Sequence, residues 1–135
     1  MKKLKFLLLT ILFFGTLSFA QEVEVGPNNF SSTINSNKAV LVKFWAPWCG
    51  PCTMLKPEFE KAEQIAGNKV LFATYNIDLR GEPLRAYNVT VIPTMILFVD
   101  GKEVARSNSI LSAQDIADWV LGYVPQAATV NGFQN

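Results

Sequence analysis

Cys49 and Cys52 are the residues of this sequence best suited to do chemistry, and they are its only cysteines. Two residues, Gly50 and Pro51, separate them. A disulfide across so short a loop removes little entropy from the unfolded chain, so it is a weak structural crosslink. The same spacing lets two thiols form and break a disulfide during a reaction. The pair therefore indicates thiol–disulfide exchange.

The two cysteines are expected to have different roles because a helix begins between them. Cys49 lies at the predicted helix N-terminus, where unpaired backbone N–H groups and the helix dipole favour a thiolate, so its pKa should fall below about 8.5. Cys52 is nearly one turn further on and should be less exposed. We predict that Cys49 attacks a substrate disulfide and that Cys52 resolves the mixed disulfide. Gly50 allows close approach, Pro51 stiffens the turn, and Trp48 offers a flat apolar wall.

The composition limits other catalytic and metal chemistries. The chain has no histidine, which excludes His-based acid–base catalysis and Cys–His nucleophilic pairs. A structural zinc site needs four ligands, and no further Cys or His is present to complete one. We therefore predict no metal and no cofactor beyond the redox-active Cys49–Cys52 disulfide. Because no run of like charges occurs, we expect no nucleic-acid partner.

The elements expected around the pair alternate between strand and helix. The apolar run Ala39 to Ala46 predicts a strand covered on both faces, and a helix should follow from about Cys49 to Ala66. The other patterns predict an extended segment over 21–27 and strands over 70–76, 94–99 and 103–107, with a hairpin turn at Asp100-Gly101. They also predict a short helix from Asn28 or Asn29 to Asn35 and another within 78–88. A last helix should be capped by Ser112, with Asp115 in a variant capping box. This order predicts one α/β domain, with a central mixed β-sheet flanked by helices on both faces.

The first twenty residues have the composition of a secretory signal peptide. Lys2, Lys3 and Lys5 precede an apolar stretch, and small residues lead up to Ala20. We expect cleavage after Ala20, which leaves residues 21–135 and, with three lysines lost, takes the formal net charge from +1 to −2. An uncleaved anchor is the alternative, but the apolar stretch is shorter than the ~20 residues of a spanning helix. Export to the periplasm or cell envelope would place the cysteines where disulfides persist.

Several segments of the chain occur in a characteristic order. They are Phe44-Trp45-Ala46-Pro47-Trp48-Cys49-Gly50-Pro51-Cys52, Met54 with Pro57, Asn76-Ile77-Asp78, Ile92-Pro93-Thr94, Asp100-Gly101 and Leu111-Ser112. In this order they resemble the thioredoxin family over about residues 28–124, which implies a thioredoxin fold; residues 125–135 should form a frayed tail. The resemblance also implies a cis Ile92–Pro93 bond, with Pro93 facing the cysteines and the Ile92 backbone binding an extended substrate.

The resemblance implies a thiol–disulfide oxidoreductase, and the Gly50-Pro51 dipeptide is associated in the family with reducing behaviour. We expect a monomer that reduces disulfides of exported proteins and draws electrons from a thiol reductant donor in the membrane. An envelope thiol oxidase or isomerase is one alternative. A non-enzymatic binding module that uses the groove around Trp48, Ile92 and Pro93 is another.

Lys43 and Thr74 depart from the family pattern. Thioredoxins usually carry a buried Asp where this chain has Lys43, and they tend to carry a Lys in the next strand where this chain has Thr74. A cation near the sulfurs would stabilise a thiolate, so Lys43 is a candidate tuning residue. The other interpretation, which the cost of burying an unpaired charge favours, is that Lys43 extends its ammonium to water along the core.

Overall fold

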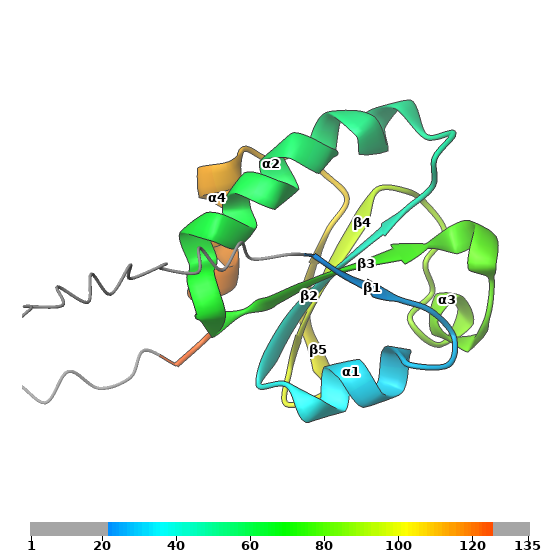
Figure 1. The fold of residues 1–135 in the computed structure, drawn as a ribbon, viewed down its shortest axis with the longest axis horizontal. Coiled ribbons are helices and arrows are strands. Elements are labelled where there is room, and N and C mark those ends of the chain that lie inside the picture. Colours follow the sequence, from blue (N-terminus) through cyan, green and yellow to red (C-terminus); the bar gives the residue numbers. More distant parts are fainter. Residues whose placement is uncertain (1–21, 126–135) are drawn as a thin grey trace, which may run out of the picture.

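A five-stranded mixed sheet forms the centre of the computed structural model, which describes residues 22–125 (Figure 1). The strands are β1 (Val23–Val25), β2 (Ala39–Trp45), β3 (Leu71–Asn76), β4 (Thr94–Val99) and β5 (Lys102–Ser107), in the spatial order β1-β3-β2-β4-β5. The first three are mutually parallel, while β4 runs antiparallel to β2 and β5 antiparallel to β4. The predicted mixed sheet is confirmed. The proposed signal peptide and most of the proposed tail lie outside the described residues.

Four helices cover the two faces of this sheet. They are α1 (Phe30–Ser36), α2 (Gly50–Ala66), α3 (Glu82–Ala86) and α4 (Ala113–Leu121), with short 3-10 turns η1 (Gly67–Lys69) and η2 (Ile77–Leu79). In Figure 1, α2 and α4 lie on one side of the sheet and α1 and α3 on the other. Among the residues described, no helix is long and apolar enough to cross a membrane.

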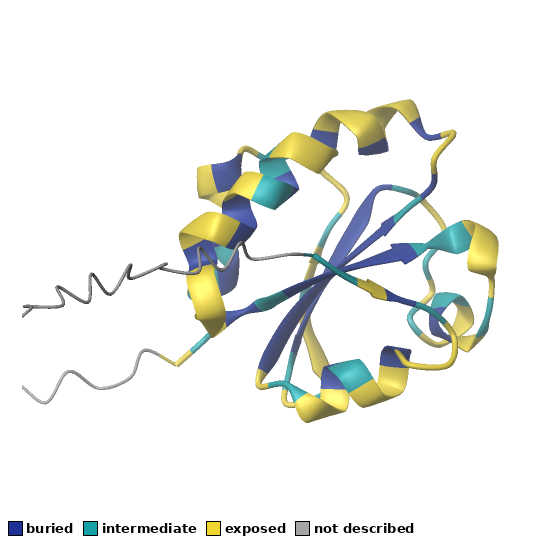
Figure 2. Ribbon diagram, viewed as in Figure 1, coloured by how far each residue is buried: buried dark blue, intermediate teal, exposed yellow. Residues whose placement is uncertain are grey.

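Alternation along β2 explains why this strand is buried on both faces. Ala39 and Leu41 pack into the core beneath α2 and α4, while Val40 and Val42 pack beneath α1. Successive side chains of a strand point to opposite faces, so a strand covered by helices on both sides must be apolar almost throughout. Figure 2 shows the central strands as the most deeply buried part of the fold.

Aromatic contacts anchor the helices to the sheet. Phe59 of α2 meets Phe72 of β3 with ring centroids 4.9 Å apart in an edge-to-face arrangement, and both rings are fully buried. On the opposite face, Phe30 of α1 packs edge-on against Phe98, with centroids 5.7 Å apart. Such pairs add about 0.5–1.5 kcal/mol to the gain from burial. The Phe59–Phe72 pair holds α2, and with it the cysteine pair at its N-terminus, against the sheet.

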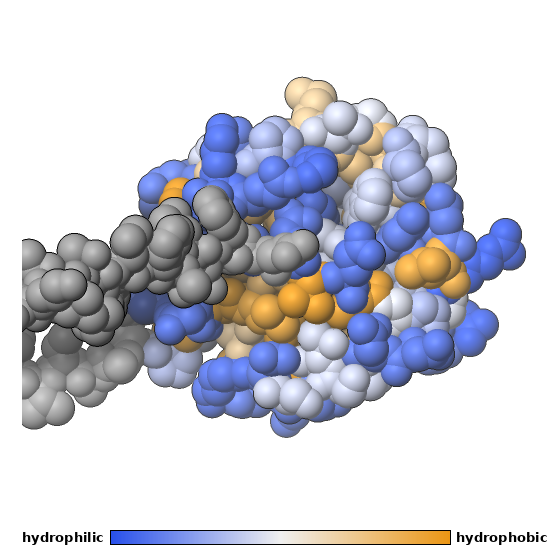
Figure 3. Space-filling model, in the orientation of Figure 1, coloured by the Kyte–Doolittle hydropathy of each residue, from blue (hydrophilic) through white to orange (hydrophobic). Residues whose placement is uncertain are grey.

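The surface above β1 and β3 is more apolar than the helices that flank it. Figure 3 shows an apolar band across this face where Figure 1 places the β1–β3 edge of the sheet, with hydrophilic surface beside it. Val23 and Leu71 are partly buried members of the core beneath α1. Because β1 has only three residues, the edge offers few free backbone groups for pairing with another strand.

Most predicted boundaries agree with the structure to within a residue or two. The strand over 94–99 is confirmed, and Asp100 and Gly101 both have positive φ, of 52° and 76°, as a two-residue hairpin turn requires. At α4, Ser112 caps the helix by accepting the Asp115 N–H at 3.2 Å. In a capping box, the Asp115 carboxylate would accept the backbone N–H of Ser112. Here it accepts a hydrogen bond from the Ser112 hydroxyl instead, at 2.7 Å.

Candidate active site

The cysteine pair lies where β2 ends and α2 begins. Cys49 is the N-cap of α2 with an extended backbone (φ −90°, ψ 108°), so the helix starts at Gly50, one residue later than predicted. The Cys52 N–H donates to the Cys49 sulfur across 3.3 Å. This N–H would remain without an intrahelical acceptor in the first turn, and it favours negative charge on the sulfur. The local geometry is therefore suited to a Cys49 thiolate.

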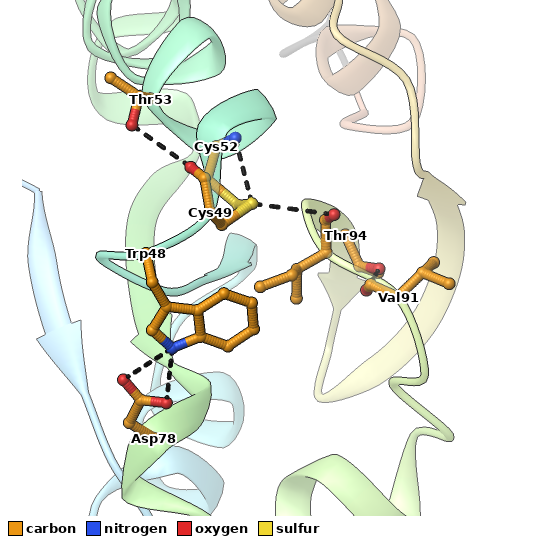
Figure 4. Close-up of a disulfide and its surroundings, with 8 residues drawn as sticks. Trp48, Cys49, Cys52, Thr53, Asp78, Val91 and Thr94 are labelled. Carbon is orange, nitrogen blue, oxygen red and sulfur yellow. Dashed lines mark hydrogen bonds between the residues drawn. A yellow bond between two sulfur atoms is a disulfide. The ribbon is translucent and has the colours of Figure 1, made fainter.

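The two sulfurs form a disulfide in this structure, as Figure 4 shows. Cys49 is 6% exposed and Cys52 is 3% exposed, so exposure differs little between them. Their surroundings differ more. The Cys49 sulfur faces the loop before β4, whereas Cys52 lines a cavity beneath α2. The sulfur of Cys49 is thus the one next to the Ile92 backbone.

The loop before β4 provides the opposite wall of the site. The Ile92–Pro93 peptide bond is cis, as the resemblance implied, and the Ile92 carbonyl oxygen lies 3.9 Å from the Cys49 sulfur. The Thr94 hydroxyl donates to the Val91 carbonyl at 2.6 Å and accepts from the Asn108 amide at 2.7 Å. These bonds fix the loop on β4 and β5. The Ile92 backbone is therefore held beside the Cys49 sulfur.

Trp48 forms the exposed side of the site, with 68% of its surface accessible. Its indole N–H donates to both carboxylate oxygens of Asp78, at 3.1 and 3.2 Å, and Figure 4 shows the ring lying beside the disulfide. The Asn76 side chain in turn accepts the Asp78 N–H at 2.9 Å. Asp78 orients the ring, a role that the sequence analysis did not assign. The position of Asp78 just after the end of β3 is the one feature of the sequence that could have indicated this role.

Gly50 and Pro51, predicted to admit and shape the substrate, are both exposed in the first turn of α2. A Cβ built on Gly50 would meet no atom of this chain within 4 Å. Gly50 therefore leaves open surface beside Cys49, and no packing within the described fold requires a glycine there. The role of both residues in binding a partner stays a prediction.

Lys43 does not extend to water, so the interpretation we favoured for it from the sequence is wrong. Its side chain is 3% exposed, its Nζ lies 3.7 Å from Glu22 Oε1, and the same Nζ is 4.2 Å from the centre of the Phe59 ring. Burial, partly offset by the Glu22 charge, lowers the pKa of Lys43 below its usual 10.5. Lys43 is paired with Thr74 in the sheet register, as neighbouring positions of β2 and β3. A partly hidden carboxylate from the segment before β1 makes this burial tolerable.

A cavity of about 510 Å³ connects these groups to the active site. Its lining includes Cys52, Lys43 and Glu22, together with Glu24 from β1 and Thr74 from β3. The face of α2 that closes it contributes Thr53, Lys56, Glu60, Glu63 and Gln64, and Trp45 completes the lining. The side of the site beneath α2 is therefore rich in charged residues, although the side formed by Trp48 and Ile92 is apolar.

Comparison with known proteins adds to this geometry. The family model described as thioredoxin matches residues 21–121. The chain is 48% identical over 82 residues to a thioredoxin of Chlamydia caviae, covering 61% of this chain and 78% of that protein. It is 44% identical over 77 residues to the bifunctional thioredoxin reductase/thioredoxin of Mycobacterium leprae, covering 57% of this chain but only 17% of that protein. A solved structure of a mutant thioredoxin from Halobacterium salinarum matches with a TM-score of 0.72 at 28% identity, covering 83% of this chain and 98% of that one.

Proposed function

The chain belongs to the thioredoxin family of Cys-x-x-Cys disulfide reductases, and from that premise we propose that it reduces disulfide bonds in exported proteins. The observation that carries the proposal is the setting of the Cys49 sulfur. It accepts a helix N-terminal N–H and lies 3.9 Å from the Ile92 carbonyl oxygen, beside the exposed ring of Trp48. A substrate strand bound along the Ile92 backbone would bring its disulfide to this sulfur.

The reaction proceeds by two exchanges of sulfur partners. The Cys49 thiolate attacks one sulfur of the substrate disulfide, forming a mixed disulfide and releasing the other substrate sulfur as a thiolate. Cys52, as a thiolate, then attacks the Cys49 sulfur. The Cys49–Cys52 disulfide forms and the second substrate thiolate leaves. The substrate has gained two electrons, and the protein is left in the oxidised form that the structure contains.

The location and the electron donor are part of the same proposal. Residues 1–20 have the charge and hydropathy order of a signal peptide, which supports export to the periplasm or envelope. A reductase there has no access to cytosolic dithiols, so a thiol donor carried by a membrane protein would regenerate the reduced pair. Sequencing the N-terminus of the protein isolated from the cell envelope should give Gln21 first. A protein found in the cytosol with residues 1–20 intact would refute the export.

The direction of the reaction is tested by the reduction potential. The full chain is equilibrated with glutathione buffers of known ratio, and its dithiol fraction is measured by alkylation and mass spectrometry. We expect a value near the family reference of about −270 mV, which is a property of thioredoxins and not a result of this geometry, together with reduction of a model protein disulfide. A potential above about −180 mV, in the range of disulfide isomerases and oxidases, would refute the reductase direction. Binding that survives replacement of both cysteines by Ser, without any reduction, would indicate a binding module.

A further inference from the structure

Behind the disulfide, the structure places a charge pair that the proposed reaction does not yet use. Lys43 is one of four buried polar or charged residues among the residues described, and its Nζ has only the Glu22 carboxylate, at 3.7 Å, as an ion-pair partner. Within residues 22–125, Glu22 Oε1 is buried and has no hydrogen-bond partner. An ion pair held at this distance, without a hydrogen bond to Glu22 Oε1, is expensive to bury. A role at the site would account for its presence.

Strand alternation directs Lys43 toward the cysteines. On β2, Leu41 lies in the core beneath α2, and Lys43 is two residues further along on the same face. Its Nζ contacts Phe59, which is two helical turns beyond Cys52 on α2. Both Lys43 and Cys52 line the cavity beneath this helix. Lys43 and the second thiol therefore line one cavity that is partly open to solvent.

The Glu22 charge reaches across the same space. Glu63 lies on α2, on the opposite wall from Glu22, and it too lines the cavity. Burial raises the pKa of Glu63, and the charges of Glu22 and then Glu60 raise it further. The other charged groups that face the cavity are Glu24 from β1 and Lys56 from α2, where Lys56 is paired with Glu60. Cys52, at the start of α2, lines the same cavity as Glu22, so the Glu22 charge also faces this thiol.

We propose that Glu22 and Lys43 act as a compensated charge pair that sets the acidity of Cys52. The Lys43 ammonium favours the Cys52 thiolate, and the Glu22 carboxylate opposes it. The family's usual arrangement has a carboxylate at the β2 position. Here the cation occupies that position, and the carboxylate comes from the segment before β1, so the charge at the β2 position has the opposite sign. Glu22 is thus a positioning residue that acts on Cys52 by its charge.

This pair controls the second exchange of the reaction, in which Cys52 must lose its proton. The inference rests on the proposed resolving role of Cys52 for its consequence, but the acidity of Cys52 can be measured without any substrate. Replacing Cys49 by Ser leaves Cys52 as the only thiol of the chain. The pKa of Cys52 is then obtained from the pH dependence of its alkylation rate and of thiolate absorbance.

The test compares three changes in this single-thiol full chain. Lys43→Met removes the cation and leaves Glu22, so it should raise the pKa of Cys52 by about one unit, a tenfold loss of thiolate below that pKa. Glu22→Gln removes the anion, so it should lower the pKa of Cys52. The combination of both changes restores a neutral pair and should return the pKa to near that of the parent. Lys61→Met and Glu82→Gln are matched controls, because both side chains are exposed and lie outside the cavity, and they should leave the pKa unchanged.

Opposite signs for the two single changes are the signature of an electrostatic role, because disruption of the fold would move the pKa of Cys52 in one direction in both variants. Shifts of the Cys52 pKa in the same direction in both variants, or shifts no larger than those of the controls, would overturn the proposal. In the chain with both cysteines, Lys43→Met should also slow release from a preformed mixed disulfide about tenfold at neutral pH. Should the pKa values shift as expected while this release rate stays constant, Cys52 would not be the resolving thiol. That result would refute the proposed function and leave the charge pair intact.

Discussion

Replacing the buried pair by neutral side chains should change how stability depends on pH. In the folded protein, burial holds the pKa of Lys43 below 10.5, its value when exposed. Between the lowered pKa and 10.5, the unfolded chain therefore binds more protons than the folded chain. Stability must rise with pH in this window, by up to about 1.4 kcal/mol per pH unit for one group. A variant without Lys43 lacks this contribution.

The double variant Glu22→Gln/Lys43→Met isolates the effect because it leaves neither charge without its partner. At pH 7 we expect it to be as stable as the parent or more stable, by up to about 4 kcal/mol, since buried ion pairs often cost more in desolvation than they return. Its advantage should shrink as the pH approaches 10.5. Burial also raises the pKa of Tyr75, but that group is present in both proteins and cancels in the difference.

The assay is guanidinium unfolding of the oxidised proteins, followed by tryptophan fluorescence from pH 7 to pH 10.5. The oxidised form contains no free thiol among its two cysteines, so alkaline exchange of disulfides does not interfere. A stability difference that stays constant across this range, or one that grows in favour of the variant, would show that burial does not lower the pKa of Lys43.

Three further changes test separate parts of the structure. Phe59→Ala should cost about 3–5 kcal/mol of unfolding free energy, because the ring is fully buried against Phe72; a loss under about 1 kcal/mol in guanidinium unfolding would contradict the packing described for α2. Ser112→Ala should cost about 1 kcal/mol by removing the cap of α4, with Ser112→Asn as a variant that retains a capping side chain and most of the stability. Asp78→Ala should release the indole of Trp48 and lower kcat/KM for a protein disulfide about fivefold, if the bond is worth about 1 kcal/mol, while global stability changes little. An unchanged kcat/KM would show that Asp78 does not orient the ring for catalysis.

Local signals in the sequence predicted much of the fold because they act within a few residues. The apolar run from Ala39 predicted a doubly covered strand, and Asp100-Gly101 predicted a tight turn, since both depend on side-chain pattern or backbone freedom alone. The cysteine pair was predicted for the same reason. Its spacing and its position at a strand-to-helix junction are local facts, and the structure places Cys49 as the helix cap.

Contacts between distant segments were not predictable in this way. Glu22 reaches Lys43 only because β1 joins the sheet beside β3. The three residues of β1 carry no pattern that predicts which strand they pair with. The carboxylate of Asp78 meets the indole of Trp48 across 30 positions of sequence. Without the Glu22 partner in view, the cost of burying Lys43 favoured an exposed ammonium, and the structure overturned that expectation. Such errors arise where an ion pair forms between two segments that are distant in the sequence.

The central claim, that Cys49 attacks and Cys52 resolves, is tested most directly by trapping the mixed disulfide. Each single variant, Cys49→Ser and Cys52→Ser, is mixed in reduced form with a protein that carries one accessible disulfide, and the products are analysed by mass spectrometry without reductant. We expect Cys52→Ser to accumulate a stable adduct that is bonded through Cys49 and is released by dithiothreitol, and we expect Cys49→Ser to form none. An adduct bonded through Cys52 in the Cys49→Ser variant, at a rate matching that of Cys52→Ser, would contradict the assignment.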